Sequence, residues 1–304
     1  MTSPISYFGG DFVPHEQAQV SIASHVVNYG TGCFEGIRAY WNEADEQLYV
    51  TLLDQHIDRL VRSARVLRLD LAMSAAELRE IVLELLRRNE LREDAYIRPL
   101  VFKSDQTITV TLGGVRTEVA AYCRPMGGYL DIDRGLRLRV SSWQRIDDNA
   151  VPARAKAIGS YINAALASDD ARRDGYDEAL MLTSDGHLAE ASSSNVFIVA
   201  DGELLTPAGS DDILIGITRA AVQTLAAELG HRVRETRLDR SQALAADEVF
   251  LCGTGVQVAP VTEIDGRVIG SGKPGPVTMQ VQQRYLDVVR GRSADHAEWR
   301  TPVY

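Results

Sequence analysis

The stretch PARAKAIGSYINAAL, residues 152–166, contains the residue on which the assignment of fold and chemistry depends. Lys156 is one of three lysines in a chain with 32 basic residues, so arginine supplies the positive charge almost everywhere else. Arginine keeps its proton in proteins, whereas lysine can lose it and act as a nucleophilic amine. Alanine, isoleucine and glycine lie close to Lys156, and such partly dry surroundings favour the neutral amine. We therefore predict that Lys156 is catalytic; a surface lysine is the alternative.

The other two lysines lie in less suitable places. Lys103 precedes Ser-Asp-Gln, which indicates an exposed strand end. Lys273 lies in the turn GSGKPGP. That turn is not a phosphate-binding loop, because Pro274 replaces the serine or threonine of the motif.

The composition is that of an ordinary globular protein, with 304 residues, 45% apolar and 24% charged. The net charge of −10 argues against nucleic acid or an anionic membrane as a partner. Cys33, Cys123 and Cys252 form no disulfide framework, and the six histidines show no metal-ligand spacing, so no metal site is expected. No apolar run is long enough to span a bilayer and no signal peptide is visible, so a cytoplasmic location is expected.

Residues 1–125 are expected to form a small N-terminal domain. Asp54 predicts the start of a helix over 55–68, and Ser74 with Glu77 forms a capping box for a helix that ends near Asn89. Alternating apolar residues and turn signals predict a hairpin in YFGGDFVP and strands over 37–41, 48–52, 95–103, 107–112 and 117–124. This mixture of helices and strands indicates an α+β fold.

Residues 126–135 are rich in glycine and turn formers and are expected to form an interdomain loop. A larger second domain is expected over 136–304. Strands are predicted in LRLRVSSW, EALMLT, NVFIVA and DEVFLCG, hairpin turns at the three Asp-Gly pairs 185–186, 201–202 and 265–266, and helices over 160–173, 217–229 and 276–290.

Several further residues could take part in chemistry with Lys156, although each is a weak signal alone. Tyr161 follows five residues later, and a phenol near an imine could tune its proton. Glu190, in HLAEASSSNVFIV, would need a cationic partner if it were buried; a solvated loop glutamate is the alternative. The helix that starts in GITRAAVQTL offers an anion site at its N-terminus, and Arg59 could add a bidentate contact to a phosphate.

Taken together, these motifs resemble the fold-type IV enzymes that depend on pyridoxal 5'-phosphate (PLP), and within them the branched-chain amino acid aminotransferases. The resemblance covers most of the chain. The segments that carry it are YGTGCFEGIRAY (29–40), HIDRL (56–60), AYIRPL (95–100), SSW (141–143), AKAIGSYINAAL (155–166), GYDEALMLTSDGHLAEASSSNVF (175–197), GITR (216–219) and DEVFLCGT (247–254). It implies two domains, a small α/β domain and a larger one with a pseudo-barrel sheet and flanking helices.

The resemblance also implies roles at the cofactor. Lys156 matches the lysine that binds PLP as a Schiff base and moves the substrate proton, Tyr161 the tyrosine at the phenolic oxygen, and Glu190 the glutamate paired with the pyridine nitrogen. For the phosphate, the matching residues are Arg59, Ile217, Thr218 and Thr254. Asn195 matches the asparagine that closes the small-residue loop.

The family's substrate pocket is matched by Phe34, Gly36, Tyr96, Arg98 and Tyr129. Tyr96 and Arg98 form a Y-x-R pair on one face of a strand, and in the family this pair helps to admit the distal carboxylate of glutamate. The backbone at Thr254 and Gly255 matches the turn that receives the substrate α-carboxylate. Since family pockets borrow residues from a partner subunit, at least a homodimer is expected.

The implied reaction transfers the amino group of leucine, isoleucine or valine to 2-oxoglutarate, so the partners are amino acids and 2-oxo acids. The chain departs from the usual family pattern at Met126, in the serines 192–194, over residues 104–118 and at Gly255–Val256, and these positions bear on substrate choice. The altered pocket loop leaves a side activity on (R)-amines possible. An (R)-amine transaminase, a D-amino acid transaminase, an aminodeoxychorismate lyase and a non-catalytic binding protein stay open as alternatives.

Overall fold

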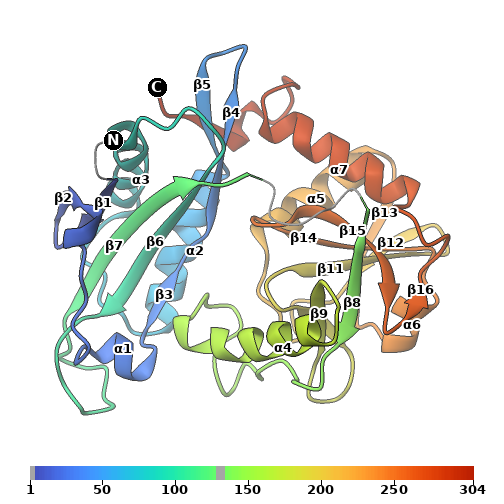
Figure 1. Ribbon diagram of the computed structural model, residues 1–304, viewed down its shortest axis with the longest axis horizontal. Coiled ribbons are helices and arrows are strands. Elements are labelled where there is room, and N and C mark those ends of the chain that lie inside the picture. Colours follow the sequence, from blue (N-terminus) through green and yellow to red (C-terminus); the bar gives the residue numbers. More distant parts are fainter. Residues whose placement is uncertain (1–3, 128–133) are drawn as a thin grey trace. The chain divides into compact units, whose positions relative to one another are not determined.

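The computed structural model describes residues 4–127 and 134–304, and the chain divides into two compact units (Figure 1). Unit 1 consists of Met1–Gly127, Ala155–Ser160 and Val288–Tyr304, and unit 2 of Gly128–Arg154 and Tyr161–Asp287. The predicted boundaries assign 155–160 and 288–304 to the second domain, whereas the structure groups both segments with unit 1. The predicted interdomain loop lies mostly outside the described residues.

Strand pairing explains why these two segments belong to unit 1. Ala157 forms an antiparallel bridge with Cys33. Near the C-terminus, β17 (Arg300–Pro302) pairs with β5 (Gln47–Thr51). Both contacts join residues that are far apart in the sequence, so local patterns do not reveal them.

Unit 1 is built on an eight-stranded sheet in the order β17-β5-β4-β6-β7-β1-β2, with β3 paired to β6. Its other strands are β1 (Ile5–Phe8), β2 (Asp11–Pro14), β3 (Gly32–Phe34), β4 (Ile37–Asn42), β6 (Ala95–Lys103) and β7 (Thr117–Pro125). The predicted N-terminal hairpin and four of the five predicted strands are confirmed. The helices of the unit are α1 (His25–Tyr29), α2 (Leu53–Val66) and α3 (Ala75–Asn89), together with the 3-10 turns His15–Gln17, Ile158–Ser160 and Ala297–Trp299.

The two long helices of unit 1 bury apolar faces in one core. Ile57, Leu60 and Ala64 of α2 pack there with Leu78, Val82, Leu85 and Leu86 of α3 and with the sheet. The predicted capping box of α3 is confirmed: Ser74 Oγ accepts from the N–H of Glu77 at 3.2 Å, and Glu77 Oε2 accepts from the N–H of Ser74 at 2.8 Å.

Three local predictions for unit 1 are wrong. Helix α2 starts at Leu53, because β5 runs to Thr51 and the chain turns at Leu52 with φ 51; Asp54 therefore lies inside the first turn and does not cap the helix. Residues 107–112 alternate like a strand but pair with no strand of the described chain, and Ile108 is 90% exposed. Lys103 is fully buried, and its Nζ donates to the carbonyl of Val115 at 2.7 Å.

Unit 2 is built on a nine-stranded sheet in the order β10-β9-β8-β15-β14-β11-β12-β13, with β16 paired to β15. The sheet curls into a half-barrel, as the predicted fold class requires, around a core that includes Leu138, Leu180, Val196 and Leu251. Its strands are β8 (Leu136–Val140), β9 (Glu178–Leu182), β10 (Leu188–Ala191), β11 (Asn195–Ala200), β12 (Glu203–Thr206), β13 (Arg232–Glu235), β14 (Glu248–Gly253), β15 (Gln257–Ile264) and β16 (Arg267–Val268).

The helices that accompany this sheet are α4 (Tyr161–Arg173), α5 (Ile217–Glu228), α6 (Arg240–Leu244) and α7 (Pro276–Val289). The three predicted Asp-Gly turns join β9 to β10, β11 to β12 and β15 to β16. At two of them the aspartate and the glycine both have positive φ, as a two-residue hairpin turn requires. Among the described residues, no helix is both long and apolar enough to cross a membrane.

Candidate active site

Lys156 lies in unit 1, and its backbone is held from two sides. The N–H of Phe34 donates to the carbonyl of Lys156 at 3.1 Å. The N–H of Lys156 donates to Ser63 Oγ of α2 at 3.2 Å. Ala155 and Ala157 are buried, while the Lys156 side chain is half-buried, with Nζ 5.1 Å from the centre of the Phe34 ring. The predicted partly dry surroundings of this lysine are therefore present.

Polar residues form a stripe along one side of α2, and Ser63 of this stripe contacts the backbone of Lys156. His56, Arg59 and Ser63 are buried, and their spacing places them on one side of the helix. Arg59 Nε lies 2.6 Å from Glu35 Oε1 and its Nη2 lies 2.9 Å from Glu35 Oε2, so the two side chains form a bidentate pair. His56 Nδ1 lies 2.7 Å from Glu35 Oε2. One carboxylate thus holds two neighbouring side chains of α2.

The Glu35 carboxyl is ionised despite full burial. Burial raises its pKa, but the charge of Arg59 and the hydrogen bonds from Arg59 and His56 outweigh burial and hold the pKa well below its usual value. Burial lowers the pKa of His56, as do the nearby charges of Arg59 and Lys156, while Glu35 opposes the change. His56 is therefore neutral at pH 7 and donates from Nδ1, because a carboxylate can only accept.

The predicted pocket residues of unit 1 cluster around Phe34. Arg98 Cζ lies 4.3 Å from the centre of the Phe34 ring, and Arg98 Nη2 donates to Tyr96 Oη at 2.6 Å. Gly36 is required here, since a Cβ atom at this position would lie 2.3 Å from Tyr96 Oη. Arg98 Nε is buried and makes no hydrogen bond with the described residues. The Y-x-R pair thus does reach the same face.

Glu190 of unit 2 is buried, and its carboxylate lies among polar partners. Arg145 Nε lies 2.7 Å from Glu190 Oε1. The N–H direction departs from hydrogen-bond geometry, so we treat this contact as an ion pair. Asn195 Nδ2 donates to Glu190 Oε2 at 3.1 Å and to the carbonyl of Leu214 at 2.9 Å. The prediction that a buried glutamate at this position needs a cationic partner is confirmed, although this partner is Arg145.

The N-terminus of α5 is fitted closely against Asn195. Gly216 occupies the N-cap position, where no side chain caps the helix, and a Cβ atom there would lie 2.0 Å from Asn195 Oδ1. Ile217 and Thr218 form the first turn, so their backbone N–H groups lack partners within the helix. An uncapped helix start of this kind can bind an anion.

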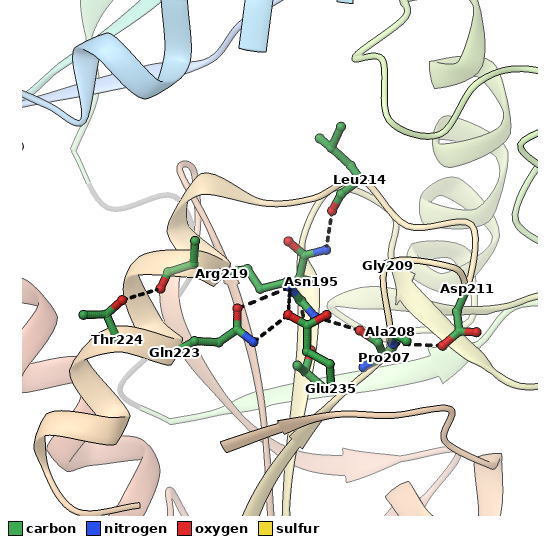
Figure 2. A network of polar contacts seen from close by, with 12 residues as sticks. Asn195, Pro207, Ala208, Gly209, Asp211, Leu214, Arg219, Gln223, Thr224 and Glu235 are labelled. Carbon is green, nitrogen blue, oxygen red and sulfur yellow. Dashed lines mark hydrogen bonds and ion pairs between the residues drawn. The ribbon is translucent and has the colours of Figure 1, made fainter. Parts of the chain in front are cut away.

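Arg219 anchors the start of α5 to neighbouring segments of unit 2 (Figure 2). Its side chain is 2% exposed, donates from Nη2 to the carbonyl of Pro207 at 2.8 Å and pairs with Glu235 through Nη1 at 3.1 Å. Gln223, one turn later, donates to the same Glu235 oxygen at 3.0 Å. These contacts fix the helix start in place.

The remaining predicted residues of unit 2 lie where a helix begins or where a turn joins two strands. Tyr161 is the first residue of α4 and is partly buried. Thr254 and Gly255 form the partly exposed turn between β14 and β15. Tyr129 lies outside the described residues.

Sequence reasoning missed Glu35, His56, Ser63, Arg145 and Arg219. A signal existed for two of them, because His56 and Ser63 recur with Arg59 at helical spacing between apolar residues. Glu35 had a weaker signal, since it is a charge inside an otherwise apolar stretch. Arg145 lies in a loop and showed no signal.

Comparison with known proteins shows the family of the chain. The family model for class IV amino-transferases matches residues 32–264. A probable branched-chain-amino-acid aminotransferase of Aquifex aeolicus is 48% identical over 300 residues, which cover 98% of this chain and 96% of the relative. The branched-chain aminotransferase of Thermoproteus uzoniensis, solved with norvaline, is 42% identical with a TM-score of 0.96, and all of both chains is covered. The branched-chain amino acid aminotransferase of Thermobaculum terrenum, solved in its PLP form, is 37% identical with a TM-score of 0.94 over 99% of each chain. The chain belongs to the class IV aminotransferases, a family that uses PLP.

Proposed function

We propose that this enzyme transfers the amino group of leucine, isoleucine or valine to 2-oxoglutarate, with PLP as its cofactor. The observation that carries the proposal is the arrangement around Phe34, whose ring contacts both Lys156 Nζ and the Arg98 guanidinium. A reactive amine and a cation that could receive a distal carboxylate share one aromatic wall. Such a wall suits a site that accepts both apolar and acidic side chains.

The described residues fit PLP. In unit 1, Arg59 offers donors to a phosphate and Lys156 an amine to an aldehyde. In unit 2, the uncapped start of α5 offers backbone donors that suit a phosphate. The buried carboxylate of Glu190 is suited to accept an N–H from a protonated ring nitrogen. Tyr161, Asn195 and Thr254 complete the proposed cofactor set.

Bound PLP supplies the electron-withdrawing ring system that the reaction requires. Lys156 Nζ would take the proton from the α-carbon of the amino acid and deliver it to the carbon that PLP contributes as its aldehyde. The Tyr96 and Arg98 side chains orient the substrate through its own side chain, with Phe34 and Gly36 as neighbours and Tyr129 as a further wall residue. The turn at Thr254 and Gly255 binds the substrate α-carboxylate through backbone N–H groups.

A half-reaction panel tests the substrate assignment. The PLP form of the protein is mixed separately with L-leucine, L-glutamate, D-alanine and (R)-1-phenylethylamine, and the cofactor spectrum is followed. We expect rapid conversion with the first two compounds only. Conversion by D-alanine or by the (R)-amine in preference to L-leucine would support one of the alternative transaminases instead.

We also propose that the enzyme is a homodimer. Ile22 and Ile108 are 88% and 90% exposed, and Val110 is 74% exposed, which is unusual for large apolar side chains. Tyr29 Oη donates to the carbonyl of Ile108 at 2.7 Å and orders the segment that carries two of them. Sedimentation velocity of the wild type and of Ile108→Asp is the test, with a shift of the variant toward monomer as the expected result. The cytoplasmic location stays a prediction.

A further inference from the structure

The carboxylate of Glu35 accepts hydrogen bonds from Arg59, His56 and Gly36. Its Oε1 accepts from Arg59 Nε, and its Oε2 accepts from Arg59 Nη2, from His56 Nδ1 and from the N–H of Gly36 at 3.3 Å. Three of these four contacts converge on Oε2, so several donors hold the carboxylate at once. Glu35 is 0% exposed and cannot rotate without breaking several of these contacts at once. The orientation of the Arg59 guanidinium is therefore set by this residue.

Because the guanidinium is planar, fixing one of its edges also fixes the direction of the others. Arginine presents its five N–H groups in a rigid fork, and two edges of the fork can each bind an oxyanion bidentately. Glu35 takes the edge formed by Nε and Nη2. The second bidentate edge, formed by Nη1 and Nη2, then points away from Glu35. A phosphate bound at that edge would accept from two N–H groups whose directions are already fixed.

The local charges allow an anion to bind close to a carboxylate. Glu35 and Arg59 neutralise each other, and His56 is neutral at pH 7, so the buried group carries no net charge. The Lys156 segment is attached to the same helix face through Ser63. The Arg59 donors and the reactive lysine are thus held by one element of unit 1, which matters for a cofactor that is bound through both its phosphate and its aldehyde.

We propose that Glu35 is a positioning residue for the cofactor phosphate: it holds the guanidinium of Arg59 so that its outer edge binds the phosphate of PLP. This inference rests on the proposed function, in which Arg59 is a phosphate ligand. It assigns to Glu35 no contact with the cofactor or with the substrate. Its effect is therefore confined to ligands that carry the phosphate.

The test compares two ligands that differ only in the phosphate. The dissociation constants of PLP and of pyridoxal are measured with apoenzyme by fluorescence titration for the wild type, Glu35→Gln, Arg59→Lys and the double variant. For Glu35→Gln we expect PLP affinity to fall about 10- to 100-fold, the usual cost of losing a residue that orients a ligand-binding group. Pyridoxal affinity should stay close to wild type. The double variant should be no worse than Arg59→Lys alone, because both changes remove the same interaction.

Glu248→Gln is the matched control. Glu248 is also a buried carboxylate with several donors, since it accepts from the N–H groups of Val277 and Thr278 and from Thr278 Oγ1, but it belongs to unit 2 and caps α7. This variant should lower thermal stability and leave the ratio of the two dissociation constants unchanged. If Glu35→Gln does not fold, Glu35→Asp decides the question, because it keeps the charge but draws the carboxylate back from Arg59.

Three outcomes separate the possibilities. If Arg59→Lys leaves the ratio of PLP to pyridoxal affinity unchanged, the proposed phosphate role of Arg59 itself is wrong. If Arg59→Lys lowers the ratio but the Glu35 variants do not, the role of Arg59 stands and the inference about Glu35 is overturned. Equal losses for PLP and pyridoxal in the Glu35 variants would mean general damage to the fold, and would also overturn it.

Discussion

Glu190 and Arg145 form an ion pair of 2.7 Å in which the two side chains are only 8% and 11% exposed. The pair joins a strand of the half-barrel sheet to the loop that follows β8. Water reaches neither charge freely, so each depends on the other for most of its compensation. Asn195 and the N–H of Leu214 also donate to the carboxylate, the latter at 3.3 Å and 3.4 Å.

Replacement of Arg145 by glutamine should destabilise the apoenzyme. It leaves a buried carboxylate without its cation, which typically costs about 3 kcal/mol. Urea denaturation of the apoenzyme at pH 7.5 measures this loss. Arg139→Gln is the control, because Arg139 forms an exposed pair with Asp174 at 3.3 Å and should contribute at most about 1 kcal/mol. Equal destabilisation by the two variants would contradict the buried-pair argument.

Two glycines of the proposed substrate site should differ in their sensitivity to an added methyl group. In Gly36→Ala the new Cβ would lie 2.3 Å from Tyr96 Oη and would displace Tyr96 from Arg98, so kcat/KM with L-leucine should fall about 100-fold. In Gly255→Ala the new Cβ meets no atom of the described chain within 4 Å, and kcat/KM should stay near the wild-type value. Steady-state kinetics of both variants tests the pair. A larger loss in Gly255→Ala would show that steric contact with Tyr96 is not the cause.

The parts of the fold that local chemistry determines were predictable from sequence. The Ser74 capping box and the hairpins at Asp201–Gly202 and Asp265–Gly266 depend on residues within a few positions of one another. The pairing of β17 with β5 and the bridge between Ala157 and Cys33 depend on residues more than a hundred positions apart. No periodicity in the chain reveals such contacts, and they decide which unit contains Lys156.

The candidate site also has residues that the sequence predicts and partners that it does not. Residue type and motif were enough to select Lys156, Glu190 and the Y-x-R pair. The partners of these residues were not predictable, because Glu35 and Arg145 gain their roles only when strands and loops bring them to Arg59 and Glu190. The segment 107–112 shows the converse: it alternates like a strand, but no described strand lies beside it to complete the pairing.

The stability of the apoenzyme should fall as the pH drops below 6.5, and His56 should contribute to that fall. Its pKa in the folded state is lowered from 6.5, so below pH 6.5 the unfolded chain binds a proton that the folded chain resists. The contribution is at most about 1.4 kcal/mol per pH unit. Glu35 acts in the same direction, but only below its unfolded pKa of 4.5.

Urea midpoints between pH 5 and pH 7.5 measure this effect. Since glutamine can donate to Glu35 but does not titrate, His56→Gln should flatten the dependence between pH 5 and 6.5. A variant with the same slope as the wild type would exclude His56 as a source of the acid sensitivity.

Replacement of Arg98 by methionine should separate the two substrates of the proposed reaction. A charged hydrogen bond contributes about 1.5–3 kcal/mol, so the KM for 2-oxoglutarate should rise about 10- to 100-fold. The half-reaction with L-leucine should change little, since its side chain needs no cation. Arg62→Met, at an exposed position of α2, is the control and should change neither value. Equal losses for both substrates would argue against a role of Arg98 in binding the distal carboxylate.

The assignment of Lys156 permits the most direct test, because only one lysine should carry the cofactor. Borohydride reduction of the PLP form followed by peptide mapping should place the pyridoxyl label on Lys156. Lys103 is fully buried and its Nζ is bound to a carbonyl, while Lys273 is exposed in a turn, so neither should be labelled. Lys156→Arg keeps the charge but provides no nucleophilic amine, and it should abolish both the label and turnover. Lys273→Arg should retain both. A label on Lys103 or Lys273 in the wild type, or full turnover of Lys156→Arg, would show that another group carries out the chemistry.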